Sequence, residues 1–399
     1  MDNRAARRRT AATTRHTKNA LGELPPAVLV SRTARAGTRG QPVPAQTREE
    51  ADEPEALVVS YCFDSGETGE PHSATVRLTG RRSGVQGLRQ PHDDFEQEDR
   101  IEGILPGTGK VSITSWVYGL NPGEWTVKAE LLAPDTDGRR DRSLTVGAIQ
   151  PAEWSWRRWT LTTGSSGPLK TRWAKLAPLA KMPGVVPGSW PVLGALGVLV
   201  ALVTLAAILA HEDGAVAQSM LVFVVALASG LTAAKVWYAV LHPGPWRQAI
   251  LGGWAVDGFL LIAPLAAIAA LLAFNLPVGT VLDAAAPGMF FGVAIGRVGC
   301  FLTGCCAGRI SRSRWSVWSS DRRIGARRIP AQLMESAAGL VIGFAAALLV
   351  LGHPAHMSGA VFVGGLAVYF IVRQALLRVR AERREFSWRR RTNTGLTSA

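Results

Sequence analysis

The stretch GVAIGRVGCFLTGCCAGR (292–309) decides the fold of this chain. It is the end of an apolar segment that carries Arg297 among closely spaced glycines; an arginine-rich loop follows, and RRIPAQLMES (327–336) opens the next apolar segment. Between Arg297 and Arg328 the sequence holds eight arginines and one acid, Asp321. A cationic, glycine-rich loop between two hydrophobic segments is suited to meet an anionic ligand at a membrane boundary. The simpler alternative is a loop whose charge only sets membrane orientation.

Six apolar segments surround this stretch and predict a membrane-spanning all-α bundle. About twenty predominantly apolar residues are needed to cross the hydrocarbon core of a bilayer. The segments are rich in glycine and alanine, which permit close helix packing, and most connecting loops are short, which favours antiparallel neighbours. The predicted transmembrane helices cover about 190–210, 217–241, 253–274, 279–301, 331–351 and 358–379.

The charge of the chain points to a membrane and its lipids as partners. The formal net charge is +14, and the basic residues gather beside the hydrophobic segments, where they attract anionic headgroups and set orientation. We therefore expect no nucleic-acid partner. Because the segment before residue 190, the loop after the fourth span and the C-terminal tail are all basic, the charges place these parts and both termini on the cytoplasmic side.

The region before the spans predicts a separate, smaller fold. Runs such as ALVVSYCF (56–63) and EWTVKAELL (124–132) alternate apolar and polar residues and are separated by turn dipeptides, which predicts a small antiparallel β-sandwich-like domain. The predicted organisation is a disordered basic tail, this domain, a basic Trp- and Pro-rich linker at the membrane interface, the transmembrane domain and a basic C-terminal tail, at 1–54, 55–149, 150–189, 190–380 and 381–399.

Two clusters of residues with metal-binding potential have simpler interpretations. The acids that follow His92 favour a solvated loop over a cation site; they are Asp93, Asp94, Glu96, Glu98 and Asp99. Three cysteines at the end of the fourth span lack the paired CxxC spacing of a zinc site, and small-residue packing is favoured over metal or redox chemistry; they are Cys300, Cys305 and Cys306. We expect neither a metal nor a cofactor.

Ionisable residues inside the predicted spans are the strongest functional candidates, because burial of a charge in a membrane is costly unless it is paired or hydrated. They are Lys235, Asp257, Asp283, Arg297, Glu335 and Arg373, with Tyr238, Gln332 and Tyr369 as polar companions. One hypothesis is an internal salt-bridge network. The other is a site in which the planar guanidinium groups of Arg297 and Arg373 hold the phosphate of a phosphodiester headgroup that arrives from the lipid.

Several of these segments resemble, in order, the motifs of the prolipoprotein diacylglyceryl transferases. GRVGCFLTGCCAGR is similar to the signature of that family, and RRIPAQLMES is similar to the start of its following helix. The other similar segments are AAKVWYAVL (233–241), GGWAVDG (252–258), VLDAAAP (281–287) and GAVFVGGLAVYFIVR (359–373). The resemblance covers about residues 190–380, and residues 1–150 have no counterpart in it.

The resemblance implies a reaction in the plasma membrane that moves a diacylglyceryl group from phosphatidylglycerol to the lipobox cysteine of a prolipoprotein. By position, Arg297 and Arg373 match the essential arginines, and Asp257 stands where the family has a histidine, so that it could serve as the base or neutralise a cation. The implied substrate-binding residues are Lys235, Tyr238, Gly299, Gly304, Gln332, Glu335 and Tyr369. The chain also departs from the signature at Cys300, which replaces an asparagine, and at Ile329, which replaces a histidine. The resemblance implies that the signature loop lies on the outer side of the membrane, whereas the charge pattern places it on the cytoplasmic side, and both orientations stay open.

Three functional hypotheses follow from these residues. The first is an active diacylglyceryl transferase with a variant site. The second is a catalytically altered relative of the same fold that binds anionic phospholipid and recruits a partner through the β-domain. The third is a thiol or metal protein built on the three cysteines of the signature.

Overall fold

The computed structural model describes a β-rich part and a helical part of the 399-residue chain. The described residues are 30–35, 55–132, 149–211, 214–241, 255–352 and 358–381, with the backbone alone described for 30–35 and for 256, 257 and 260. The larger part of both predicted basic tails therefore lies outside the described residues.

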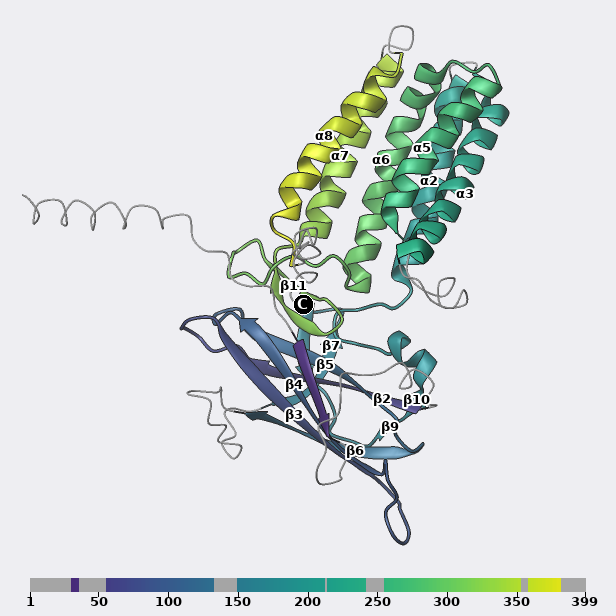
Figure 1. The fold of residues 1–399 in the computed structure, drawn as a ribbon. Coiled ribbons are helices and arrows are strands. Elements are labelled where there is room, and N and C mark those ends of the chain that lie inside the picture. The colour runs from purple at the N-terminus through teal and green to yellow at the C-terminus, as the bar shows by residue number, and fades with distance from the viewer. Residues whose placement is uncertain are drawn as a thin grey trace, which may run out of the picture.

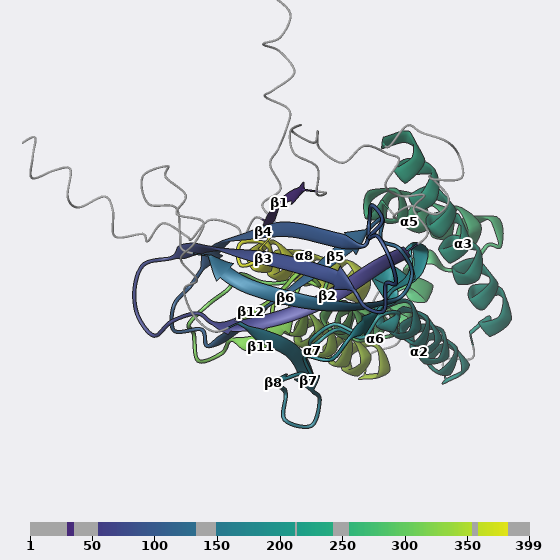
Figure 2. The same ribbon diagram turned by 90° about the horizontal axis from the view of Figure 1, so that it is seen from below.

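Two antiparallel sheets form the β-rich part (Figures 1 and 2). One has the order β1-β4-β3-β6-β9, and the other has the order β11-β12-β5-β2-β7-β8, with β10 also paired to β2. The strands are β1 (Val30–Arg35), β2 (Glu55–Asp64), β3 (His72–Arg82), β4 (Asp94–Ile104), β5 (Lys110–Tyr118), β6 (Glu124–Leu132), β7 (Gln150–Ser155), β8 (Thr160–Thr163), β9 (Leu169–Lys170), β10 (Arg172–Trp173), β11 (Val317–Ser320) and β12 (Ile324–Arg328).

The core between the sheets follows from the alternation in the sequence. On β3 the buried positions are Ala74, Val76, Leu78 and Gly80, every second residue, as expected when one face of a strand is covered. The first three pack with residues of the other sheet, such as Leu57 and Ile113, in one apolar cluster. The antiparallel β-fold expected before the membrane spans is therefore present.

Two segments differ from the sequence prediction. Val30–Arg35, inside the predicted disordered tail, forms β1 and pairs with β4, because the edge of a sheet offers unpaired backbone groups to any nearby chain segment. The predicted linker 150–189 supplies strands β7 to β10 and the 3₁₀-helix η2 (Ala174–Leu179), and these strands extend the two sheets. Local composition identified the tryptophans and lysines of this linker but not its strand partners, which lie far away in the sequence.

Among the described residues, five helices are long and apolar enough to cross a membrane, and the chain is a multi-pass membrane protein. They are α2 (Ser189–His211), α3 (Val216–Leu241), α6 (Val278–Thr303), α7 (Ala331–Gly352) and α8 (Ala360–Leu377). The remaining predicted span, the third in the chain, corresponds to α5 (Val256–Ala273), which packs against α3 and whose apolar run is described over Leu261–Ala273. Within the described residues, five of the six predicted spans meet the length and hydropathy that a crossing requires, and the span at α5 stays a prediction.

The β-rich part covers one end of the helical part (Figure 1). At that end lie the first residue of α2, the last residue of α6, the first residue of α7 and the last residue of α8. The segment between α6 and α7, predicted as a loop, forms the β11–β12 hairpin, and Ile324 and Gly325 of β12 pair with Ile113 and Ser112 of β5. The arginine-rich segment is thus part of the same sheet as the β-domain.

The helices approach each other closely through small residues. A Cβ on Gly292 of α6 would lie 2.7 Å from the carbonyl oxygen of Gly197 of α2, and a Cβ on Gly197 would lie 2.6 Å from that of Gly292. Glycine is required at both positions because any side chain would separate the two backbones. This contact fixes α6, which carries the signature arginine, against the first span.

Candidate functional site: an arginine centre around Glu335

The signature segment places Arg297 near the end of α6. The helix ends because Gly304 adopts a left-handed conformation with φ 75°, and its N–H bonds back to the carbonyl of Phe301. A Cβ on Gly304 would lie 2.7 Å from the carbonyl oxygen of Ser320, so the turn also needs glycine for space. Arg297 therefore lies about two helical turns before the end, on the side of the bundle that faces the β-domain.

Glu335 on α7 collects the ionic contacts of the site. Its Oε1 accepts from Arg297 Nη2 at 2.9 Å and from Arg373 Nη1 of α8 at 2.6 Å. The hydroxyl of Tyr369 donates to the same oxygen at 2.7 Å, and Arg380 Nη2 donates to Oε2 at 2.7 Å. Side chains from α6, from α8 and from the segment after α8 thus converge on one carboxylate of α7.

The charges at this centre do not balance among the contacts that the structure describes. Three guanidinium groups surround Glu335, whose side chain is fully buried, so the group of four carries two excess positive charges. The side chains of Arg297 and Arg373 keep 16% and 19% exposure, whereas Arg380 keeps 8%. An unbalanced, low-dielectric cationic centre attracts an anion strongly, and the two partly exposed arginines are the groups that an anion can reach.

The loop after α6 is held against this centre by Gln332 and Arg380. Gln332 is buried and donates from Nε2 to the carbonyl of Cys305 at 2.8 Å. Arg380 accepts a hydrogen bond at its carbonyl from Arg309 Nε at 3.1 Å, and the N–H of Arg309 bonds to Val379. The oxygen Oε1 of Gln332 and the nitrogen Nε of Arg380 are buried without a hydrogen-bond partner among the described residues.

Sequence reasoning missed Arg380. It lies in a basic run just beyond α8, where nothing in the sequence separates it from the neighbouring arginines. Its position becomes significant only because the chain turns back beside residues 307–309 after Leu377, with the N–H of Ala381 bonded to the carbonyl of Ala307. A buried guanidinium on the second oxygen of Glu335 results from that turn.

The structure gives Gly299 a role in packing. A Cβ on Gly299 would lie 3.1 to 3.3 Å from atoms of Ser189, Trp190 and Leu193 at the start of α2. The space in the Cβ direction of Gly299 is therefore occupied by protein, as it is at Gly304, and the expected role of both glycines in substrate binding stays a prediction. Gly296, next to Arg297, has no atom within 4 Å of a built Cβ and is the glycine of this segment with open space.

Three further candidates lie on α3 and α5. Lys235 and Tyr238 are half-buried on α3. The start of α5 packs beside them, because a Cβ on Gly258 would lie 2.7 Å from the carbonyl oxygen of Ala233. The side chain of Asp257 lies outside the described residues, so its expected role as a base stays a prediction.

Asp283 has a structural role that the sequence did not suggest. Its two carboxylate oxygens accept from the backbone N–H groups of Gly359 and Phe362, each at 2.8 Å. These are among the first donors of α8, so Asp283 on α6 caps a helix whose N-cap residue, Gly359, lies 76 residues later. The salt-bridge role considered for this residue is replaced by helix capping.

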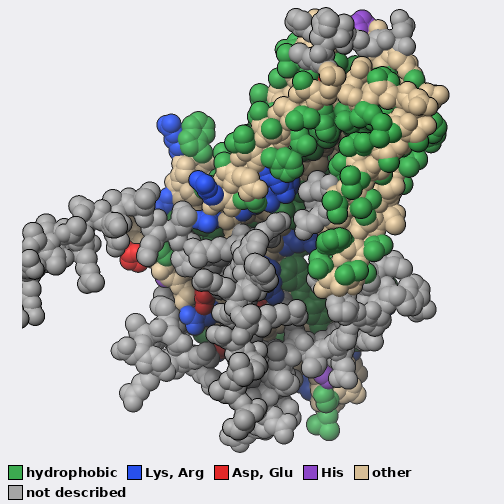
Figure 3. All heavy atoms as spheres, turned by 45° about the horizontal axis from the view of Figure 1, so that its top comes forward, with side chains coloured by type: hydrophobic (Ala, Val, Ile, Leu, Met, Phe, Trp, Pro, Cys, Tyr) green, Lys and Arg blue, Asp and Glu red, His purple; other side chains and the backbone are tan. Residues whose placement is uncertain are grey.

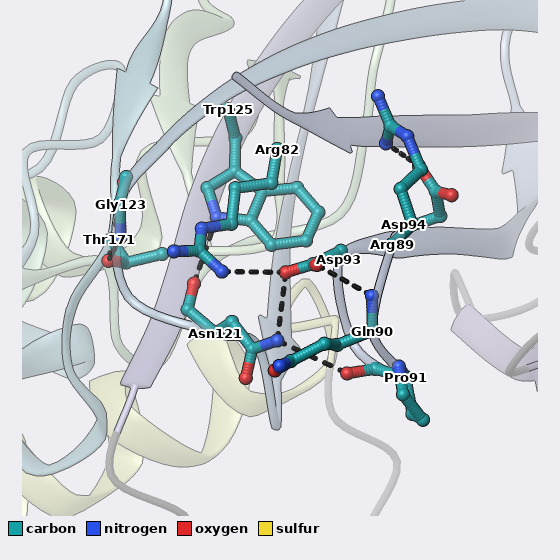
Figure 4. A network of polar contacts seen from close by, with 10 residues as sticks. All are labelled: Arg82, Arg89, Gln90, Pro91, Asp93, Asp94, Asn121, Gly123, Trp125 and Thr171. Carbon is teal, nitrogen blue, oxygen red and sulfur yellow. Dashed lines mark hydrogen bonds and ion pairs between the residues drawn. The ribbon is translucent and has the colours of Figure 1, made fainter. Parts of the chain in front are cut away.

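The acids expected in a solvated loop belong to the β-domain framework. Asp94, Glu96, Glu98 and Asp99 lie on strand β4, and Asp93 directly precedes it. Asp93 is buried, and its carboxylate accepts from Asn121 Nδ2 at 2.8 Å, Arg82 Nη1 at 2.7 Å and the N–H of Gln90 at 2.9 Å (Figure 4). Hydrogen bonds from Asn121, Arg82 and Gln90 lower the pKa of Asp93 to about 2.

The cysteines are free thiols. Cys300 is buried, Cys305 and Cys306 are half-buried, and Cys305 Sγ donates to the carbonyl of Cys300 at 3.5 Å. Within the described residues, no group of three or more His, Cys, Asp or Glu side chains is arranged to hold a metal ion. The position of the signature asparagine is thus filled by a buried thiol beside Arg297.

Comparisons with known proteins agree with the resemblance that the sequence motifs indicate. Residues 185–397, more than half of the chain, match the family model described as prolipoprotein diacylglyceryl transferase. A phosphatidylglycerol–prolipoprotein diacylglyceryl transferase of Dehalococcoides mccartyi strain 195 is 46% identical over 66 residues, which is 16% of this chain and 25% of the relative. Its counterpart in strain BAV1 is 54% identical over 44 residues, 11% of this chain and 16% of the relative. The matched part of this chain therefore spans a quarter or less of these relatives' length.

Proposed function

The chain belongs to the prolipoprotein diacylglyceryl transferase family, and from this premise we propose that it transfers a diacylglyceryl group from phosphatidylglycerol to the lipobox cysteine thiol of a prolipoprotein. The products are a thioether-linked lipoprotein precursor and glycerol phosphate. The setting is the plasma membrane, where the donor lipid and a membrane-inserted acceptor can both reach the helical part.

The observation that carries the proposal is the convergence of Arg297 and Arg373 on one oxygen of Glu335. Each arginine uses one Nη nitrogen in that contact, and each guanidinium group has five N–H donors in all. The remaining donors suit a phosphate whose negative charge grows as the bond between carbon and phosphate oxygen breaks. The acceptor thiol, once deprotonated, attacks that carbon, and the phosphate leaves with its glycerol.

The other residues of the centre have supporting roles in this proposal. Glu335 positions the two arginines and, being outnumbered, leaves the site cationic. Tyr369 orients the shared oxygen of Glu335, and Gln332 holds the signature loop through Cys305. Asp257 is the proposed base for the thiol proton, and Lys235 and Tyr238 are proposed to contact the lipid.

Transfer of label tests the proposal directly. Full-length protein in vesicles with headgroup-labelled phosphatidylglycerol and a lipobox peptide should release labelled glycerol phosphate and form a lipidated peptide. Arg297→Ala should reduce the rate by about 10² to 10³-fold, the effect typical of removing a donor that stabilises a developing negative charge. Arg314→Ala, which removes an exposed arginine of the same loop, is the matched control and should keep its rate.

A second candidate function rests on the buried Cys300, which replaces the amide of the signature. A site with the arginine centre but without that amide could bind phosphatidylglycerol without turning it over. The same assay separates the two functions. Saturable binding of phosphatidylglycerol that depends on Arg297, together with no release of glycerol phosphate beside an active family member, would establish the binding function and refute transfer.

A further inference from the structure

The short helix η2 follows directly on β10 at the surface of the β-domain, and one of its faces is apolar and exposed. In a 3₁₀-helix residues three apart lie in line, so the segment divides into three rows. Ala174, Ala177 and Ala180 form the buried row. This row packs on Ala56 and Trp116 of the β-domain, and Trp116 Nε1 donates to the carbonyl of Ala177 at 3.3 Å.

The second row is apolar and exposed. It consists of Trp173, Leu176 and Leu179, whose exposed fractions are 49%, 48% and 59%. Three large apolar side chains in line on a surface are costly in water, which indicates a binding surface rather than scattered apolar residues. The buried row holds this face in a fixed direction, so it cannot turn inward.

The third row is basic. Lys175 and Lys181 are exposed on either side of Pro178, and the ammonium group of Lys175 lies 5.0 Å from the centre of the Trp173 ring. From Trp154 to His211 the sequence has no Asp or Glu. The segment around η2 therefore offers cations without acids, which is complementary to an anionic surface.

The position of η2 in the fold places these rows close to the start of the first membrane span. Only nine residues separate Leu179 from Ser189, where the first membrane span begins. On the way, the N–H of Val186 bonds to the carbonyl of Leu302 in the last turn of α6, so the connection is tied to the end of a spanning helix. Figure 3 shows Lys and Arg side chains gathered at the end of the apolar helical part.

We propose that η2 is an interfacial anchor that docks the β-domain on the bilayer surface, with the Trp173–Leu176–Leu179 row among the acyl chains and the two lysines at anionic headgroups. An amphipathic segment with Trp and Leu on one face and Lys on the next is suited to that depth. The anchor adds a constraint on the β-domain to those given by the β5–β12 pairing and the chain connection to α2. This proposal does not depend on the proposed transferase activity.

Accessibility of a spin label tests the anchor. Full-length Leu176→Cys protein in phosphatidylglycerol-containing vesicles is labelled and exposed to oxygen, which concentrates in lipid, and to a water-soluble nickel chelate. The ratio of oxygen to nickel accessibility should be several times higher at 176 than in Leu88→Cys, a matched control at the most exposed leucine of the β-domain. Signal from the native cysteines is subtracted with the labelled parent chain.

Each result decides the proposal. Equal ratios at 176 and 88 would overturn it, because the row would then face water. A label at 176 shielded from both reagents would also overturn it and would indicate a protein partner. If the lysines act as proposed, replacing phosphatidylglycerol by phosphatidylcholine should lower the ratio at 176, and Lys175→Ser/Lys181→Ser should remove that lipid dependence.

Discussion

Two buried carboxylates that bind arginine, Asp93 in the β-domain and Glu335 in the helical part, differ in the charge balance of their networks. Asp93 binds one arginine, one amide and one backbone N–H, so one negative charge meets one positive charge (Figure 4). Glu335 binds three arginines and a tyrosine. The first network is electrically balanced, whereas the second has two positive charges in excess.

The difference separates a structural network from a candidate site. A balanced pair stabilises the fold without attracting a further charge. An unbalanced cluster in a poorly hydrated environment costs free energy until an anion arrives, and proteins keep such clusters where function needs them. By this criterion we propose the Glu335 centre as the place for a phosphate. The Asp93 network instead holds the start of β4 against the loop between β5 and β6, which contains Asn121.

Glu335→Gln should have the largest effect of the changes that test this comparison. It leaves three guanidinium groups without a counter-charge, and loss of one partner from a buried ionic network typically costs about 3–5 kcal/mol. Thermal unfolding in detergent should show a strongly destabilised helical part, and phosphatidylglycerol in excess should restore part of the loss. If the variant unfolds like the parent, Glu335 does not hold the cluster together.

Arg373→Lys should affect transfer more than stability. Lysine keeps the charge, but it loses the planar fork that can bond Glu335 and a phosphate at once. We expect transfer to fall about 10- to 100-fold, the worth of one hydrogen bond to a charged group. The matched change in the balanced network, Arg82→Lys, should leave transfer unchanged; equal losses in both variants would erase the distinction between the two networks.

The pH dependence of the β-domain tests the balanced network. The native pKa of Asp93 is about 2, below the ordinary value of an aspartate, because Asn121, Arg82 and Gln90 donate to its charged form. Its contribution to stability is therefore complete above about pH 4 and is lost as the pH falls toward 2. Circular dichroism melts from pH 7 to pH 2 should show this loss in the parent and a weaker one in Asp93→Asn. Parallel curves would contradict the assigned contacts.

The smallest expected effect concerns the joint between the two regions. Trp318 of β11 stacks on Trp154 with ring centres 4.4 Å apart, and its Nε1 donates to the carbonyl of Lys110 at 3.0 Å. Trp318→Phe keeps an aromatic ring but removes that donor, so we expect a loss of about 1 kcal/mol in stability and little change in transfer. Urea unfolding measures the loss of stability, and the label-transfer assay measures the rate of transfer. A large loss of transfer would mean that the hairpin position controls the arginine centre.

Much of the centre was visible in the sequence. Arg297, Glu335, Tyr369 and Arg373 stand out because charged or polar groups are rare inside apolar spans. Arg380 does not, since it follows the span and has arginine neighbours on both sides. Asp283 shows the opposite case: a charge inside a span that looked functional caps a distant helix.

The strands near the membrane could not be predicted for a related reason. β11 and β12 have four and five residues, too short for a clear alternation, and β12 pairs with a strand about 210 positions earlier. The linker strands β9 and β10 have two residues each. Such short strands form because a sheet edge is already in place, and the sequence of the strand itself carries little signal.

The sequence by itself determined the properties that are set by near neighbours along the chain. These are the apolar runs long enough to cross a membrane, the alternating segments that form strands, and the rare charges that lie within spans. The tertiary structure decided which charges meet. The rotation of α6, α7 and α8 about their axes, and the turn of the chain after α8, bring three arginines to one glutamate. Electrostatic energy depends on distances of a few ångströms between groups up to 83 positions apart, and no local pattern records those distances.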